Sequence, residues 1–274
     1  MQARALRFEK IEGLGNDFIV VRAENEGAVS REQAWLLCDR RFGVGADGVL
    51  LVLPGRAGAV AHMRVINADG SVPEMCGNGL RCVALALASA GLATGSSGGG
   101  SFLVSTDAGL RECEVTGDGA RAQVTVDMGP VRVGEALDLE AEGVALHLVR
   151  ADAGNPHAVT FDAVPEEVFR RVGLAFATHA AFPRGANIEL TRVGPTGLDV
   201  VVWERGVGLT LACGTGACAA LAVACAEGRA AYDTPTEVRL PGGALRITLR
   251  RSDGHALMEG PARRVFTGEV LVTG

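Results

Sequence analysis

One short pattern occurs twice in this chain and constrains its fold more than any other feature. Cys-Gly-x-Gly runs into an Ala/Leu-rich stretch at Cys76 and again at Cys213, which lie 137 residues apart (213 − 76 = 137) in a chain of 274. Each copy predicts a helix that begins at a cysteine. Two such helices, one in each half, favour two thiols that face each other across an interface. That arrangement suits a reaction that needs one acid and one base on opposite sides of a single carbon.

The segments around the two cysteines predict the same order of elements in each half. Alternating apolar residues predict strands before each cysteine helix and further strands after it. We therefore expect an α/β (α+β) chain built as a tandem pseudo-repeat, with its junction near Met128. One domain would hold residues 1–127 together with 263–274, and the other would hold residues 128–262, so that each carries one cysteine motif.

The composition excludes several classes of protein. Hydrophobic residues make up 48% of the chain and charged residues 21%, which is typical of a globular protein and not of a disordered one. The formal net charge is −6 and no block of Lys and Arg occurs, so neither nucleic acid nor a membrane surface is an expected partner. The longest apolar stretches, such as residues 83–93, fall well short of the roughly 20 residues that cross a bilayer. The N-terminus lacks the pattern of a signal peptide, and we expect a cytoplasmic protein.

The cysteines and histidines indicate neither a disulfide scaffold nor a metal centre. Seven cysteines are an odd number, and their spacings are not the CxxC pairs of zinc sites. In a reducing cytosol they should be thiols, and five of them are expected to pack in the core: Cys38, Cys82, Cys113, Cys218 and Cys225. The five histidines are scattered without a close pair, so no metal is expected.

A cysteine at the start of a helix has a chemical use. The first turn of a helix presents unpaired N–H groups and a partial positive charge, which favour a thiolate, and the thiolate is the competent base. Glycines allow the backbone to approach a ligand closely and to aim its N–H groups at a carboxylate. The alternative interpretation is a glycine-rich helix start with a buried cysteine, and the second copy makes that alternative weaker.

Polar islands interrupt the apolar strands ahead of each cysteine. Asn67 precedes the first motif, and Glu204 with Arg205 precedes the second. An arginine there could pair with a substrate carboxylate, and a glutamate could accept hydrogen bonds from an ammonium group. Alternatively, Glu204 and Arg205 form an exposed ion pair, and the asparagines, including Asn155 and Asn187, stabilise turns through their side chains.

One tempting motif fails on context. Residues 43–48 read Gly-Val-Gly-Ala-Asp-Gly and match the dinucleotide fingerprint GxGxxG. That fingerprint must follow a strand and open a helix, whereas here a predicted helix precedes it and a predicted strand follows. Nicotinamide and flavin cofactors are therefore not expected.

Longer stretches resemble a known family. In chain order they are FEKIEGLGNDFIVV, NADGSVPEMCGNGLRC, GNPHAV, NIEL, ERGVGLTLACGTGACA and GPARRVFTGE. Together they resemble the diaminopimelate epimerases over nearly the whole chain. The resemblance implies two pseudo-symmetric domains, each a curved mixed or antiparallel sheet around a central helix, with the active site in the cleft between them. It also implies a homodimer that needs no cofactor and converts LL-2,6-diaminopimelate to the meso form, for lysine and peptidoglycan synthesis.

The same resemblance implies roles for individual residues. The two catalytic cysteines of the family fall on Cys76 and Cys213. Its substrate-holding side chains fall on Asn16, Asn67, Asn155, Asn187, Glu204 and Arg205. The backbone amides that hold the reacting carboxylate fall on Gly77, Asn78, Gly214 and Thr215, and His157 lies beside the site. The chain departs from the family at Gly48, where some members carry a glutamine that touches the substrate, so no contact is assigned there.

The implied mechanism agrees with simple chemistry. An amino acid α-proton is weakly acidic, and without pyridoxal phosphate its removal requires donors aimed at the carboxylate oxygens. One cysteine must be a thiolate that takes the proton, and the other must be a thiol that returns one from the opposite face. Which cysteine serves the LL substrate and which the meso substrate stays open.

Three other functions fit parts of the sequence. A proline or hydroxyproline racemase also uses two cysteines, but those enzymes typically carry CGHG where this chain has CGNG. An amino-acid-binding protein could use the same cleft, although binding alone does not need two thiols. A thiol-redox protein could cycle through a disulfide between Cys76 and Cys213, and its activity would rise under oxidant.

Overall fold

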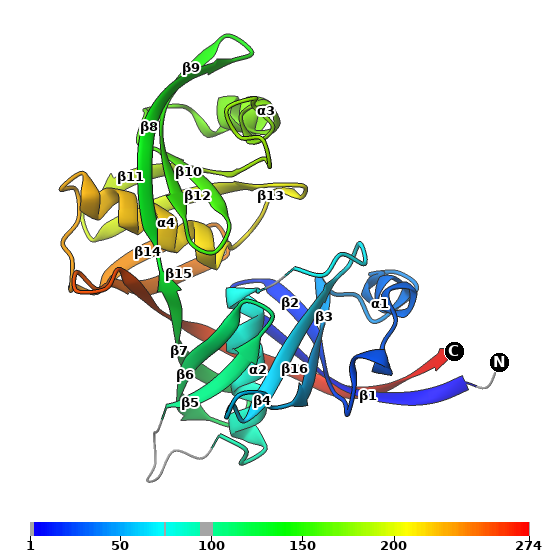
Figure 1. Cartoon of the computed structure of the whole chain (residues 1–274). Coiled ribbons are helices and arrows are strands. Elements are labelled where there is room, and N and C mark those ends of the chain that lie inside the picture. Colours follow the sequence, from blue (N-terminus) through cyan, green and yellow to red (C-terminus); the bar gives the residue numbers. More distant parts are fainter. Residues whose placement is uncertain (1–2, 74, 94–100, 274) are drawn as a thin grey trace. The chain divides into compact units, whose positions relative to one another are not determined.

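The computed structural model describes residues 3–73, 75–93 and 101–273 and divides the chain into two compact units. Unit 1 is Met1–Val126 with Gly260–Gly274, and unit 2 is Asp127–Glu259. The chain passes from unit 1 to unit 2 inside β7 (Arg121–Pro130) and returns inside β16 (His255–Thr273) (Figure 1). The sequence places these crossings after residues 127 and 262.

Unit 1 is a mixed sheet around one helix. The ladders β1–β2, β3–β4, β5–β6 and β6–β7 are antiparallel, while β2–β3 and β4–β5 are parallel. Strand β16 pairs with both β7 and β1, which closes the ring of strands. Its remaining elements are β1 (Ala3–Gly13), β2 (Asn16–Arg22), η1 (Glu26–Ala28), α1 (Arg31–Cys38), β3 (Gly48–Pro54), β4 (Ala61–Asn67), α2 (Gly77–Ser89), β5 (Phe102–Thr106) and β6 (Gly109–Asp118).

Unit 2 repeats this plan. The ladders β8–β9, β9–β10, β11–β12, β14–β15 and β15–β16 are antiparallel, while β10–β11 and β12–β14 are parallel. Its elements are β8 (Arg132–Ala141), β9 (Val144–Asp152), β10 (Pro156–Thr160), α3 (Glu166–Ala177), β11 (Asn187–Gly194), β12 (Gly197–Glu204), β13 (Gly208–Leu209), α4 (Gly214–Ala226), β14 (Thr236–Leu240) and β15 (Gly243–Leu249).

The elements of the two units follow an equivalent order along the chain. In unit 1, β2 connects through α1 to its parallel neighbour β3, and in unit 2, β10 connects through α3 to its parallel neighbour β11. Asn67 ends β4 and Glu204 ends β12, each nine residues before its cysteine (76 − 67 = 9; 213 − 204 = 9). The predicted fold class, two pseudo-symmetric α/β domains with a helix at the centre of each, is confirmed.

The two central helices are more apolar than the outer helices α1 and α3. Helix α2 packs against β1, β2, β3, β4 and β6, and α4 packs against β8 to β12, β14 and β15. Leu80 and Leu221 are fully buried on these helices. Each such leucine stabilises the fold by about 1.5–3 kcal/mol, so the packing holds the first turn of each helix in a fixed place on its sheet.

The outer helices cover the other face of their sheets. Ser30 caps α1 in a capping box with Gln33, as a serine before an apolar periodic run predicts. Helix α1 buries Leu37 in a core with residues of β2 and β3, while α3 buries Phe169 and Phe176 in a core with residues of β9 and β11. Each sheet is therefore packed on both faces, which fixes the strand ends that carry the polar residues.

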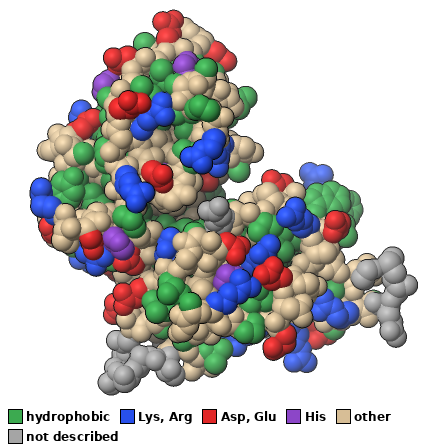
Figure 2. Space-filling model, in the orientation of Figure 1, with side chains coloured by type: hydrophobic (Ala, Val, Ile, Leu, Met, Phe, Trp, Pro, Cys, Tyr) green, Lys and Arg blue, Asp and Glu red, His purple; other side chains and the backbone are tan. Residues whose placement is uncertain are grey.

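The visible surface carries both signs of charge. Figure 2 shows acidic and basic side chains interspersed over both units, with no broad area of one sign on that face. Within the described residues, no helix is long and apolar enough to cross a membrane.

Candidate active site

Cys76 stands at the N-terminus of α2. It is the N-cap residue, with an extended backbone (φ −139°, ψ 112°), and its Sγ accepts a hydrogen bond from the backbone N–H of Gly79 at 3.4 Å. The side chain is partly exposed. The motif thus does at Cys76 what the sequence predicts, because the thiol occupies the position that a capping oxygen usually takes.

Cys213 stands in the equivalent place at the N-terminus of α4. Its backbone is extended in the same way (φ −126°, ψ 107°), but the cysteine is only 6% exposed. Its Sγ lies 3.5 Å from the Oγ1 of Thr215. The two thiols therefore share a backbone geometry and differ in their surroundings.

The environment of Cys213 corrects one expectation. A helix N-terminus favours a thiolate, yet burial raises the pKa of the Cys213 thiol well above its ordinary value, and the negative charge of Glu204 raises it further. Hydrogen bonds from Thr215 and from the backbone of Gly216 act in the opposite direction and are weaker. Cys213 is consequently a thiol at neutral pH, which suits a proton donor.

The second glycine of each motif allows the helix to lie close against a strand. A Cβ on Gly79 would come within 3.0 Å of Leu50 on β3, and a Cβ on Gly216 within 2.8 Å of the Glu189 carboxylate on β11. The Gly216 Cβ would also lie 3.3 Å from the Sγ of Cys213. The glycines are needed because the cysteines sit at a close contact between helix and sheet.

The first backbone amides of α2 and α4 precede the hydrogen bonding within each helix. Helical hydrogen bonding begins with the N–H of Leu80, donated to Cys76, and the N–H of Ala217, donated to Cys213. The preceding N–H groups lie before the first of these helical hydrogen bonds. They belong to the residues expected to hold a carboxylate, Gly77 and Asn78 in α2 and Gly214 and Thr215 in α4.

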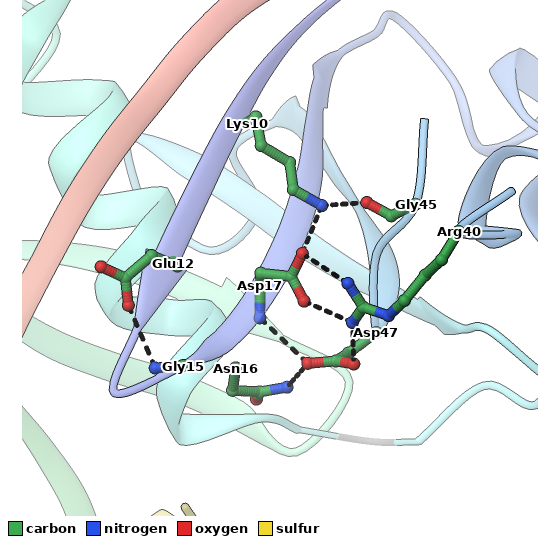
Figure 3. A network of polar contacts seen from close by, with 8 residues as sticks. All are labelled: Lys10, Glu12, Gly15, Asn16, Asp17, Arg40, Gly45 and Asp47. Atoms are coloured by element: carbon green, nitrogen blue, oxygen red, sulfur yellow. Dashed lines mark hydrogen bonds and ion pairs between the residues drawn. The ribbon is translucent and has the colours of Figure 1, made fainter. Parts of the chain in front are cut away.

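Two of the predicted asparagines of unit 1 contact each other. Asn16 begins β2, and its Oδ1 accepts a hydrogen bond of 3.2 Å from the Nδ2 of Asn78, the second residue of α2. The Nδ2 of Asn16 donates to Asp47 at 2.7 Å (Figure 3). The third, Asn67, ends β4 opposite Gly48, and its Nδ2 donates to Ser71 within the turn that follows.

The asparagine of unit 2 that corresponds to Asn16 is held by a histidine. The Oδ1 of Asn155 lies 2.8 Å from the Nε2 of His157, and the Nδ1 of His157 lies 2.6 Å from the Oε1 of Glu189. The side chains of His157 and Glu189 are fully buried. Burial raises the pKa of Glu189, and the neighbouring histidine lowers it by less.

The remaining predicted residues of unit 2 lie at the ends of β11 and β12. Asn187 accepts the backbone N–H of Arg205 at 2.8 Å, and Glu204 accepts the hydroxyl of Thr210 at 2.5 Å. Burial raises the pKa of Glu204, and the hydrogen bonds from Thr210 and Cys213 oppose it. The guanidinium of Arg205 is exposed and donates to the backbone of Arg184 at 2.6 Å. These two side chains do not form the exposed ion pair that was the alternative interpretation.

Gly48 has little room for a side chain. It begins β3, and a Cβ at this position would lie 2.9 Å from the carbonyl oxygen of Ile66 on the neighbouring strand. A glutamine here would require the backbone of β3 or β4 to shift. The departure from the family pattern therefore agrees with the local packing of this chain.

The other five cysteines are buried free thiols, as predicted. Burial raises the pKa of Cys38 and of Cys225 to about 11, which makes both poor nucleophiles at neutral pH. Among residues 3–73, 75–93 and 101–273, no group of three His, Cys, Asp or Glu side chains could hold a metal ion.

Sequence reasoning missed two acidic residues that the structure places beside the predicted site. Glu189 lies in the NIEL stretch and Asp47 in the rejected GxGxxG stretch, and neither received a role. An acid within an otherwise apolar strand was the available signal for Glu189. Asp47 gave no comparable signal, because its contacts depend on how a loop packs against β2.

Comparison with known proteins gives a consistent result. The family model described as diaminopimelate epimerase matches residues 8–134 and 149–265. Diaminopimelate epimerase 1 of Nostoc sp. is 43% identical over 97% of this chain and 100% of the relative. The chloroplastic diaminopimelate epimerase of Oryza sativa subsp. japonica is 43% identical over 98% of this chain and 81% of the relative.

Solved structures share the fold at low sequence identity. A hydroxyproline epimerase from Agrobacterium vitis superimposes with a TM-score of 0.74 at 18% identity, covering 99% of this chain and 92% of that one. A phenazine biosynthesis protein from Bacillus anthracis gives a TM-score of 0.76 at 17% identity, covering 98% and 100%. At these identities the likeness extends to the fold alone.

Proposed function

Because this chain belongs to the diaminopimelate epimerase family, we propose that it converts LL-2,6-diaminopimelate to the meso form, in lysine and peptidoglycan biosynthesis. The observation that carries this proposal is the identity of 43% over nearly the full chain, together with a cysteine at the N-cap of each central helix.

The reaction needs an acid and a base of similar strength. We assign these roles to Cys76 and Cys213: one thiolate removes the α-proton, and the other thiol delivers a proton to the opposite face of the carbon. The raised pKa of Cys213 supports its role as the thiol in one direction of the reaction. In the reverse direction the roles exchange.

The carbanion-like transition state needs donors at the carboxylate. We assign this role to the backbone N–H groups of the first helical residues, Gly77 and Asn78 on α2 and Gly214 and Thr215 on α4. Helix N-termini stabilise negative charge without reorganisation, because their dipoles are already oriented. This electrostatic stabilisation stands in the place of the electron sink that pyridoxal phosphate would provide, so the proposed reaction requires no cofactor.

The second amino-acid end of the substrate needs different partners. We assign them to Asn16, Asn67, Asn155, Asn187, Glu204 and Arg205, with His157 holding Asn155. Glu204 would accept hydrogen bonds from the ammonium group, and Arg205 would pair with the carboxylate. The partly buried position of Glu204 supports this role, because a ligand cation is the partner that would favour its ionised form.

The experiment is a proton-exchange assay on purified protein. LL-diaminopimelate, proline, hydroxyproline and lysine are incubated in deuterium oxide, and incorporation at the α-carbon is followed by NMR. We expect exchange and epimerisation with LL-diaminopimelate and neither with the other three amino acids. Turnover of proline or hydroxyproline instead would establish the racemase alternative, and a requirement for added pyridoxal phosphate would contradict the proposed mechanism. Activity that rises under oxidant would favour the redox alternative.

We also propose that the enzyme is a cytoplasmic homodimer, on the basis of the family. Sedimentation equilibrium at micromolar concentration should give twice the mass of the 28.2 kDa chain. A mass equal to that of one chain would contradict the dimer.

A further inference from the structure

The GxGxxG stretch at residues 43–48 does not bind a dinucleotide in this fold but forms the loop that follows α1. Helix α1 ends at Cys38, and the following loop folds back over its last turn. The backbone N–H groups of residues 43–46 donate to the carbonyls of Leu37, Cys38 and Asp39 at 2.9–3.1 Å. These amides are therefore engaged with the end of a helix and are not available to cradle a phosphate.

The glycines of the stretch permit this close return of the chain. A Cβ on Gly43 would lie 2.2 Å from the carbonyl oxygen of Leu36, and Gly45 has a φ of +80°. Only glycine allows both the close approach at Gly43 and the positive φ at Gly45 without strain. The result is that Asp47, at the end of the stretch, arrives beside the first residues of β2, where its N–H donates to the carbonyl of Asp17 at 2.8 Å.

Asp47 then contacts three donors (Figure 3). Its Oδ2 accepts from the Nδ2 of Asn16 at 2.7 Å and from the backbone N–H of Asp17 at 3.0 Å. Its Oδ1 accepts from the guanidinium of Arg40 at 2.6 Å. An ionised carboxylate only accepts hydrogen bonds, so the amide of Asn16 must turn its nitrogen toward Asp47 and its oxygen away.

Two cations keep this arrangement charged. Arg40 also binds Asp17 at 2.7 Å, and Lys10 binds Asp17 at 2.5 Å and the carbonyl of Gly45. Two positive and two negative groups balance in one cluster, which reduces the repulsion between the neighbouring carboxylates. Burial alone would raise the pKa of Asp17, but Arg40 and Lys10 hold it below its ordinary value.

We infer that Asp47, held by Arg40, is a positioning residue that fixes the side-chain amide of Asn16 beside the N-terminus of α2. The oxygen of Asn16 accepts from Asn78, two residues after Cys76, so the orientation set by Asp47 is passed to the helix that carries the cysteine. This arrangement leaves one N–H and one lone pair of the Asn16 amide for a ligand. One donor and one acceptor match the carboxylate and the ammonium group of an amino acid, so this inference rests on the proposed function.

The kinetic test is a double-mutant cycle between Asp47 and Asn16. Asp47→Ala and Asn16→Ala should each lower kcat/KM for LL-diaminopimelate by about 10–100-fold, because each removes a hydrogen bond that involves a charged group. The double variant should lose no more than Asn16→Ala alone, because Asp47 acts only through that amide. Losses that multiply, or an Asp47→Ala variant with unchanged kcat/KM, would overturn the inference.

A matched control separates positioning from stability. Glu26 also binds two arginines, Arg56 at 2.8 Å and Arg64 at 3.0 Å, in the same unit. Glu26→Gln should leave kcat/KM unchanged. If Asp47→Ala fails to fold, Asp47→Asn replaces it, because it keeps the shape and loses only the charged acceptor.

A spectroscopic readout makes the inference independent of turnover. The side-chain amide signal of Asn16 in ¹⁵N-labelled protein can be assigned by its loss in Asn16→Ala. Asp47→Asn should shift this signal and speed its hydrogen exchange, and Glu26→Gln should not. A signal that Asp47→Asn leaves unchanged would overturn the positioning role even if the wild type is active. A wild type that is inactive on LL-diaminopimelate while the signal shifts would overturn the proposed function and leave the coupling of Asp47 to Asn16 standing.

Discussion

Behind the first turn of α2 lies Leu50 on β3, and behind the first turn of α4 lies Glu189 on β11. The two positions are equivalent. In unit 1, Phe18 pairs with Gly48, two residues before Leu50. In unit 2, His157 pairs with Asn187, two residues before Glu189. A buried phenylalanine and leucine in one repeat thus correspond to a buried histidine and glutamate in the other.

The asparagines of the two repeats show the same divergence. Asn16 is fixed by Asp47 within a cluster that includes an exposed arginine, and Asn155 is fixed by the buried pair of His157 and Glu189. The backbone is therefore repeated while the means of holding the polar side chains is not. A substrate with one reacting centre and one that must only be bound requires this combination of equivalent cysteines and unequal polar partners.

The largest effect is expected at the cysteines, where the repeats are most alike. Cys76→Ser and Cys213→Ser should each lower kcat by about 10²–10⁴-fold, because each removes one of two essential proton-transfer groups. Cys225→Ser, on the last turn of α4, should keep kcat near the wild-type value. Steady-state kinetics of the three variants measure this, and full activity in either of the first two would contradict the two-thiol mechanism.

Replacing Glu189 and His157 by the residues at the equivalent positions of unit 1, leucine and phenylalanine, should affect stability and activity differently. Glu189→Leu leaves the buried Nδ1 of His157 without a partner and should lower the free energy of unfolding by about 1–3 kcal/mol. Adding His157→Phe should recover much of that loss, since a buried polar pair can be replaced by apolar side chains at little cost. Urea unfolding measures both steps.

Activity should not return with that stability. The double variant still lacks the group that holds Asn155, so its kcat/KM should remain at least about tenfold below wild type. Recovery of both stability and activity would mean that His157 and Glu189 serve only to fill the core.

The smallest expected effect is a difference in how the free energy of unfolding depends on pH through Glu189 in unit 2 and through Asp17 in unit 1. The folded pKa of Glu189 is raised above its ordinary value of 4.5, so its contribution to stability is full below that value and is lost as the pH rises through the folded pKa. The folded pKa of Asp17 is lowered below 3.8, so its contribution is present above that value and is lost as the pH falls through the folded pKa.

Unfolding free energies between about pH 3 and pH 8 test these signs. Glu189→Gln should gain stability relative to wild type as the pH rises above 4.5, and Asp17→Asn should gain relative to wild type as the pH falls below 3.8. If the stability of both variants relative to wild type changed with pH in the same direction, the two networks would not differ electrostatically.

Much of the frame follows from local sequence. The Cys-Gly-x-Gly pattern predicts a helix start, and both cysteines are N-cap residues. The repeated order of elements predicts two equivalent domains. Strand β8 is only weakly marked in the sequence, because most of its side chains are exposed and the alternation of apolar residues is confined to Leu137, Leu139 and Ala141.

The side-chain networks could not be read from the sequence in the same way. Glu189 reaches His157 only through the parallel pairing of β10 with β11, and Asp47 reaches Asn16 only through the loop that returns after α1. The raised pKa of Cys213 depends on burial, whereas the motif by itself indicates a lowered value. Each of these properties comes from contacts between segments that are distant in the chain.

The isotope content of early product tests the two-thiol mechanism most directly. In deuterium oxide, the thiolate takes the substrate proton on one face, and the other thiol delivers solvent deuterium on the opposite face. At low conversion, each meso-diaminopimelate formed from LL-diaminopimelate should carry one deuterium at the inverted α-carbon, while the recovered LL substrate should carry none. Deuterium that enters the recovered substrate as fast as it enters the product would mean that one base serves both faces, and would contradict the account.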